Sequence, residues 1–75
     1  MIEEMVEVAC YAGSRYPQRP QRVTWRGAEH KVLAVKREWQ EPRRRCYLVR
    51  LQGPRLLRLN YYERNDRWTA TEVEP

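Results

Sequence analysis

Apolar and polar residues alternate along most of this 75-residue chain, and turn-forming residues interrupt the alternation at short intervals. Alternation with a period of two is typical of β-strands that bury one face. We expect strands at 3–11, 22–26, 30–40, 46–52, 57–61 and 68–73. For the first of these segments, 3–11, a helical turn is the alternative.

The breaks between these segments contain residues that favour turns. Pro17 and Pro20 each lack a backbone N–H donor, so the Pro- and Arg-rich stretch 12–21 is predicted to be a loop. A tight turn is expected at Gly27, and a solvated loop is expected at 41–45. Two adjacent pairs of apolar residues in 30–40 indicate a β-bulge at which the inward face changes. Further turns are predicted at Gly53-Pro54 and Asn65-Asp66.

Five or six short strands without a convincing helix predict an all-β fold, a small antiparallel barrel of the SH3-like type. Closure into a barrel removes the exposed edges of an open sheet. A chain of this length buries only roughly 60% of its unfolded surface, so residues 1–75 are expected to form a single domain. The aromatic residues expected in its core are Trp25, Tyr47, Tyr61 and Trp68.

Two cysteines, Cys10 and Cys46, are too few for a disulfide scaffold. One bridge between them is possible, although buried thiols are the preferred interpretation. No run of about 18 apolar residues and no signal-peptide pattern are present, so we expect a soluble bacterial-type protein in the cytoplasm.

Positive charge is concentrated in the middle of the chain. Thirteen of the fifteen basic residues are arginine, and residues 13–62 carry a net charge of +10, against −3 for 1–12 and −2 for 63–75. Arginine binds phosphate and stacks on aromatic rings, which favours a polyanionic partner. A GC-rich or heat-adapted genome also raises the arginine content, but it does not explain the clustering.

The strongest candidate site is the run Arg43, Arg44 and Arg45, predicted at a hairpin tip. Arg15, Arg19 and Arg22 around the Pro-rich loop add charge, provided that the barrel brings the two loops together. An ordinary solvated loop and a site for an acidic protein surface are the alternatives.

Two aromatic residues are candidate stacking platforms. Tyr62 is predicted to point outward with Arg58 and Asn60, and Trp39 lies at the end of the longest expected strand. Exposed aromatics on a basic barrel hold single-stranded nucleic acids by stacking, and they also grip proline-rich peptides.

Catalytic signals are absent from the sequence pattern. His30 has no nearby Cys, Asp or second His, and no pair of carboxylates has the spacing of an acid and a base. We therefore expect no enzyme, metal site, cofactor or small-molecule substrate.

The order of several short motifs resembles a family of small uncharacterised bacterial domains with a Trp-Arg-Gly turn. Some members of that family are encoded near genes for lesion-bypass DNA polymerases, which implies a DNA-repair context without an activity. No functional residue is carried over from it. The resemblance covers about 20–73 and rests on Pro20, Val23, Trp25-Arg26-Gly27, Val32 to Val35, Trp39, Tyr47, Val49, Leu57, Leu59, Tyr61-Tyr62 and Trp68.

The leading hypothesis is a non-enzymatic module that binds nucleic acid through an arginine-rich face. The competing hypothesis is a protein-interaction or self-assembly module, in which the acidic N-terminal strand meets a partner or the basic face of another copy.

Overall fold

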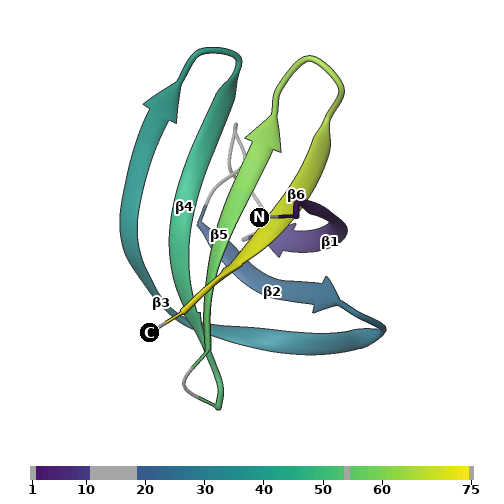
Figure 1. The fold of residues 1–75 in the computed structure, drawn as a ribbon, viewed down its shortest axis with the longest axis vertical. Helices are drawn as coiled ribbons and strands as arrows, with labels where there is room; N and C mark the ends of the chain where they lie inside the picture. Colours follow the sequence, from purple (N-terminus) through teal and green to yellow (C-terminus); the bar gives the residue numbers. More distant parts are fainter. Residues whose placement is uncertain (1, 11–18, 54, 75) are drawn as a thin grey trace.

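The structure is a computed structural model that describes residues 2–10, 19–53 and 55–74, which form six β-strands and no helix (Figure 1). The strands are β1 (Glu4–Cys10), β2 (Pro20–Trp25), β3 (Ala28–Glu41), β4 (Arg44–Leu51), β5 (Arg55–Tyr62) and β6 (Arg67–Val73).

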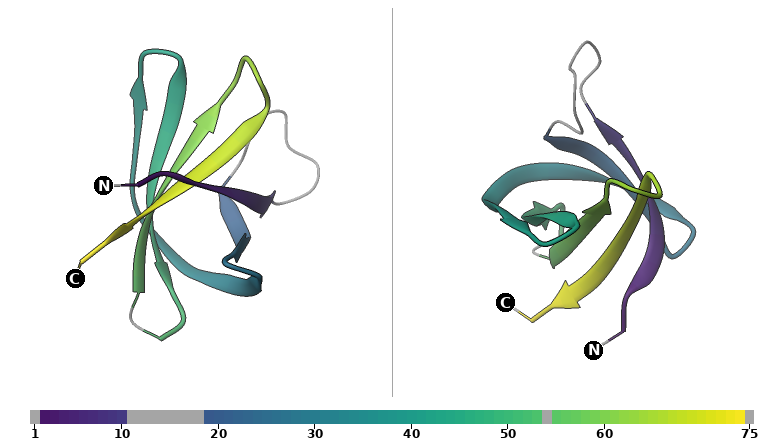
Figure 2. Two further views of the ribbon diagram at one scale, coloured as in Figure 1. Left: turned by 45° about the vertical axis from the view of Figure 1, so that its right-hand side comes forward. Right: turned by 90° about the horizontal axis from the view of Figure 1, so that it is seen from above.

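The six strands form one closed antiparallel barrel. Each strand pairs with the next along the chain, and β1 pairs with β6 to close the ring. Figure 2 shows the curled sheet from two further directions, with both chain ends on the same side of the ring. The expected all-β class and the small SH3-like barrel are therefore confirmed.

The core consists of the residues that alternate inward along the strands. As predicted, Trp25 and Tyr47 are buried in it. Tyr61 and Trp68 are half-buried, and their rings lie 4.8 Å apart beside the core. In β1 the side chain of Met5 is 62% exposed while that of Val6 is buried. The buried cluster contains Val6, Val23, Trp25, Tyr47, Val49, Leu51, Leu57, Leu59 and Ala70.

The longest strand, β3, forms the corner of the barrel. Its first residues pair with β2, and from Val32 onward it pairs with β4. The register shifts between Val32 and Ala34 and again between Val35 and Arg37, which confirms the predicted bulge. A bulge increases the local bend and twist of a strand, so one continuous strand contributes to two sides of the ring.

Two predicted loops are shorter than expected. Strand β2 begins at Pro20, which is buried, so the end of the predicted loop 12–21 belongs to the barrel, while 11–18 lie outside the described residues. The predicted loop at 41–45 is only a two-residue turn at Pro42 and Arg43, because Glu41 pairs with Arg44 across the hairpin. Opposite charges that face each other across two strands stabilise the strand pairing. The loop prediction did not include this attraction between Glu41 and Arg44.

Candidate nucleic-acid interface

The outward side of β3, β4, β5 and β6 forms a surface that we call the outer face. Because side chains alternate along a strand, residues paired in register across the sheet point to the same side. The outer face has four rows, and each row crosses the four strands in order. They are Ala34, Arg50, Leu56 and Val73; Arg37, Leu48, Arg58 and Thr71; Trp39, Cys46, Asn60 and Thr69; and Glu41, Arg44, Tyr62 and Arg67.

Arginine dominates the charge of the outer face. The rows contain five arginines and one glutamate, and Glu3 adds a second carboxylate next to Thr69. Three of the arginines, Arg37, Arg50 and Arg67, are exposed and form no ion pair with any carboxylate of the described residues. These side chains are therefore available to an external anion.

The hairpin turns after β3 and β5 extend this positive surface. Both turns lie at the same end of the barrel (Figure 1). Arg43 and Arg64 are exposed there and line a hollow of about 430 Å³ together with Tyr62 and Asn65. Neither arginine pairs with a carboxylate within the part of the chain that the structure describes.

Trp39 is a half-buried ring held between two arginines. The guanidinium carbons of Arg37 and Arg58 each lie 5.5 Å from the centre of the ring, which is cation–π distance. Its Nε1 donates a hydrogen bond to Glu41 Oε2 at 2.8 Å. These three contacts hold the ring of Trp39 in place.

Glu41 is shared by two arginines of the outer face. Arg44 Nε donates to Glu41 Oε1 at 2.8 Å, and Arg58 donates to Oε2 at 3.1 Å. The hydrogen bond from Trp39, followed by that from Arg44, lowers the pKa of Glu41 below its usual range. Conversely, the hydrogen bond to Glu41 raises the pKa of Arg44. Two guanidinium groups next to one carboxylate leave a net positive charge at this point.

Asn60 and Tyr62 are more enclosed than the sequence predicted. The side chain of Asn60 is 1% exposed, because Cys46, Thr69 and Glu3 surround its amide. Cys46 donates from Sγ to Asn60 Oδ1 at 3.4 Å, and burial raises the pKa of this thiol. Tyr62 does share the side of Arg58 and Asn60, but it is half-buried and its hydroxyl bonds to Arg44 and Glu3.

The predicted cluster of Arg43, Arg44 and Arg45 does not exist as a hairpin tip. Arg43 alone lies in the turn, and the other two begin β4 with their side chains on opposite faces. Arg45 shares the inner side with Tyr61 and forms an ion pair with Glu38 at 3.3 Å. The placement of all three at a hairpin tip was wrong, because Arg44 already pairs with Glu41 as the first residue of β4.

Of the predicted cluster around the Pro-rich loop, the structure describes Arg19 and Arg22. Arg15 lies outside the described residues, and Arg19 is exposed. Arg22 pairs in register with Lys31 and forms an ion pair with Glu29 at 3.7 Å. Neither Arg19 nor Arg22 lines the hollows next to Arg43, so these two described residues do not join the hairpin turn.

Two arginines cover the ring of Trp25. The guanidinium groups of Arg26 and Arg55 lie 4.4 Å and 5.4 Å from the ring centre of Trp25. Arg26 also binds Glu4 at 2.9 Å. The hydrogen bond from Arg26, and next that from Trp25, lowers the pKa of Glu4. Arg26 and Arg55 are thus part of the barrel's own packing.

The histidine and the two cysteines do not come together as a metal-binding group in the described residues. The ring of His30 packs 5.6 Å from that of Trp25. No group of three or more His, Cys, Asp or Glu side chains there is placed to hold a metal ion. No disulfide joins Cys10 and Cys46. In the same residues, no helix combines the length and the apolar character needed to span a membrane.

Four exposed arginines of this surface were missed as site residues by sequence reasoning. A usable signal was present, since the alternation of Arg44, Cys46, Leu48 and Arg50 predicts a common face for them. The strand-to-strand register decides which residues of neighbouring strands join that face, and periodicity alone does not supply it. The missed residues are Arg37, Arg50, Arg64 and Arg67.

No family model, no curated protein and no solved structure matches the chain. The resemblance to small bacterial domains with a Trp-Arg-Gly turn therefore stays a prediction, and the residues themselves carry the functional argument.

Proposed function

We propose that the protein is a non-enzymatic module that binds nucleic acid through the outer face and the two adjacent hairpin turns. One observation carries the proposal: five exposed arginines lie on the outer face and its two hairpin turns, and none of them pairs with a carboxylate of the described residues. They are Arg37, Arg43, Arg50, Arg64 and Arg67.

The size of the surface suits a stretch of phosphate backbone. From Arg44 to Arg50 the outer face extends over seven residues of β4, and the six rises between them span about 20 Å. One strand of duplex DNA carries about six phosphates over that length. Guanidinium groups bind phosphate through paired N–H donors, and contacts of this kind position a protein without reading sequence.

Stacking of bases is a smaller part of the proposal than the sequence suggested. The hydroxyl of Tyr62 and the Nε1 of Trp39 already bind glutamates, and both rings are half-buried. Binding by charge without extensive stacking predicts a steep dependence on salt and little preference for sequence.

The test is fluorescence anisotropy with single-stranded and double-stranded oligonucleotides over a salt series. We expect the double variant Arg37→Ala/Arg50→Ala to bind more weakly than the native protein. The slope of log affinity against log salt should become shallower by about two units, one for each lost phosphate contact. Thermal unfolding of each variant checks that the fold is intact.

The matched control is Arg19→Ala/Arg22→Ala, which removes the same charge from the face at the start of β2. Equal weakening by both double variants would mean that net charge alone decides binding. Absence of binding by the native protein at low salt, or binding that ignores ionic strength, would refute the proposal.

The competing proposal, a protein-interaction or self-assembly module, has less support from the contacts. It needs the acidic N-terminal segment to be available to a partner, but Glu3 and Glu4 bind within the chain. Glu3 and Glu7 are both exposed, but of the three N-terminal glutamates only Glu7 forms no ion pair or side-chain hydrogen bond within the described residues. Light scattering at two salt concentrations distinguishes the proposals, since charge-driven self-association predicts a dimer that dissociates as salt is added.

A further inference from the structure

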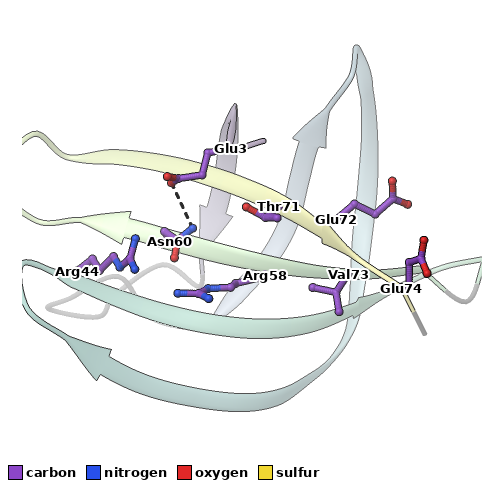
Figure 3. Close-up of a pocket in the computed structure, with 8 residues that line it drawn as sticks. All are labelled: Glu3, Arg44, Arg58, Asn60, Thr71, Glu72, Val73 and Glu74. Carbon is purple, nitrogen blue, oxygen red and sulfur yellow. Dashed lines mark hydrogen bonds between the residues drawn. The ribbon is translucent and has the colours of Figure 1, made fainter. Parts of the chain in front are cut away.

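The carboxylate of Glu3 is held by three neutral donors of the outer face. The hydroxyls of Thr69 and Tyr62 donate to Glu3 Oε1 at 2.6 Å and 2.7 Å, and Asn60 Nδ2 approaches the same oxygen at 3.5 Å. Figure 3 shows Glu3 pointing from the N-terminal segment toward Asn60. Three donors converging on one oxygen form the kind of site that binds an oxyanion.

These donors are held in place by the barrel rather than by Glu3. Asn60 is buried and also donates to Thr69 Oγ1 at 3.2 Å, and its Oδ1 accepts from Cys46. Arg44 Nη1 donates to the hydroxyl oxygen of Tyr62 at 3.2 Å, which directs the hydroxyl proton away from Arg44. The donor group would therefore keep its geometry without the glutamate.

The surroundings of the donors carry a positive charge that Glu3 neutralises. Arg44 and Arg58 line a hollow of about 640 Å³ next to Asn60, and both share the single carboxylate of Glu41. Glu72 and Glu74 line the opposite end of that hollow (Figure 3). An anion at the Asn60 end would thus replace one charge by another of the same sign.

We propose that Asn60, Tyr62 and Thr69 form a binding site for one phosphate group of a nucleic acid, and that Glu3 occupies this site in the unbound protein. The inference rests on the proposed function of the outer face. Glu3 acts as an internal competitor, so the N-terminal segment must leave before the phosphate enters. The apparent affinity is then reduced by the small fraction of molecules in which the site is open.

The test compares Glu3→Ala with Glu7→Ala, which lowers the negative charge equally. Glu7 is an exposed residue of β1 opposite Thr24, away from the donors. In anisotropy titrations with a single-stranded oligonucleotide, we expect Glu3→Ala to bind at least about fivefold more tightly than Glu7→Ala, as for a site that is open in a fifth or less of the native molecules. Adding Tyr62→Phe to Glu3→Ala should remove most of this gain.

A second readout does not depend on nucleic acid. Inorganic pyrophosphate is titrated into each variant while the side-chain amide resonances of Asn60 are followed by NMR. These resonances should shift in Glu3→Ala at lower pyrophosphate concentration than in Glu7→Ala. The variant is expected to fold, since Asn60 keeps its bonds to Thr69 and Cys46.

The outcomes separate the two proposals. Equal oligonucleotide affinity of Glu3→Ala and Glu7→Ala overturns the competitor role of Glu3 and leaves nucleic-acid binding intact. If no variant binds oligonucleotide, the proposed function fails, and the pyrophosphate shifts alone decide whether the anion site exists. Unchanged Asn60 resonances in Glu3→Ala then overturn the site as well.

Discussion

Arg43 combines an unfavourable backbone conformation with an exposed side chain. Its φ angle is +68° in the two-residue turn after Pro42, a position that favours glycine. The left-handed conformation costs a residue with a side chain roughly 1–2 kcal/mol. An exposed arginine at such a position does not improve the turn, so the geometry of the turn does not account for its presence.

Replacing Arg43 by glycine should therefore separate stability from binding. We expect Arg43→Gly to raise the free energy of unfolding by about 0.5–1 kcal/mol, because relief of the left-handed strain exceeds the added entropy of the unfolded chain. Urea denaturation measures this gain, and anisotropy should show weaker oligonucleotide binding. In Arg43→Asn the same charge is lost at a residue that tolerates this conformation less well than glycine, so a smaller gain in stability is expected. A less stable Arg43→Gly would contradict the strain argument.

At the level of single residues, the sequence predicted the inner side chains better than the outer ones. The burial of Trp25 and Tyr47 could be predicted from the alternation, since large apolar side chains are favourable only in the core. The same alternation placed Asn60 outward, and that direction is right. Its burial was not predictable, because it results from Cys46, Thr69 and Glu3 closing around it from three other segments.

Strands β4 and β5 have buried side chains on both faces, whereas a strand at the surface of a barrel usually has one buried face and one exposed to solvent. Leu57 and Leu59 contribute to the inner core, while Cys46 and Asn60 face each other in register on the outer side and are also buried. The buried amide connects β4, β5 and β6 through its hydrogen bonds. The outer face thus has a small polar core of its own.

Removing that amide should weaken the pairing of these strands. We expect Asn60→Ala to lower the free energy of unfolding by about 1–3 kcal/mol, because it leaves buried polar partners without their hydrogen bonds. Urea denaturation gives the value. Asn65→Ala, in the exposed turn after β5, is the matched control and should change stability by less than about 0.5 kcal/mol. Equal effects of the two substitutions would show that the buried network adds nothing.

The strands themselves were predictable, whereas their ends were not. The alternation of apolar and polar residues identifies β2 to β6. It does not show which polar residues at the end of a strand still pair with the neighbouring strand. Around the turn at Pro42 the decisive term is the attraction of Glu41 for Arg44 across the hairpin. That pairing becomes visible in the sequence once a two-residue turn is assumed, since Glu41 and Arg44 flank such a turn symmetrically.

Across the whole molecule, three glutamates connect segments that are distant in the sequence. Glu3 binds Tyr62 and Thr69, Glu4 binds Arg26, and Glu41 binds Arg44 and Arg58. Hydrogen bonds to their carboxylates, first from Thr69, Arg26 and Trp39 respectively, lower the pKa of each below the ordinary value of 4.5. A lowered pKa in the folded state means that the ionised form stabilises the fold.

The stability should accordingly depend on acid pH. The contribution of these carboxylates is complete above 4.5 and is lost as the pH falls through their lowered pKa values, so the urea midpoint should be lower at pH 3 than at pH 6. Glu4→Gln should reduce stability at pH 6 and make the pH dependence shallower. Glu7→Gln, in the same strand, should leave the stability at pH 6 almost unchanged. A urea midpoint independent of pH in the native protein would rule out this contribution.

The charge of the whole molecule could be predicted from the sequence only as a total. The basic residues behind the net charge of +10 in 13–62 divide into three groups. Some lie on the outer face, some form ion pairs within the chain, and two cover the ring of Trp25. The register of the strands decides to which of these groups each arginine belongs. Register depends on pairing between segments that are far apart in the sequence, so the sequence pattern of one segment does not reveal it.

The order of the strands around the barrel has a consequence for how the chain folds. Five of the six pairings join consecutive strands, so they require only short loops to close. The pairing of β1 with β6 instead brings together the two ends of the chain, at the largest entropic cost of loop closure. This late contact also carries Glu3 to Thr69, 66 residues away in the sequence. The internal anion therefore reaches its donors only in a molecule that has completed its ring, and a partly folded chain would present those donors unoccupied.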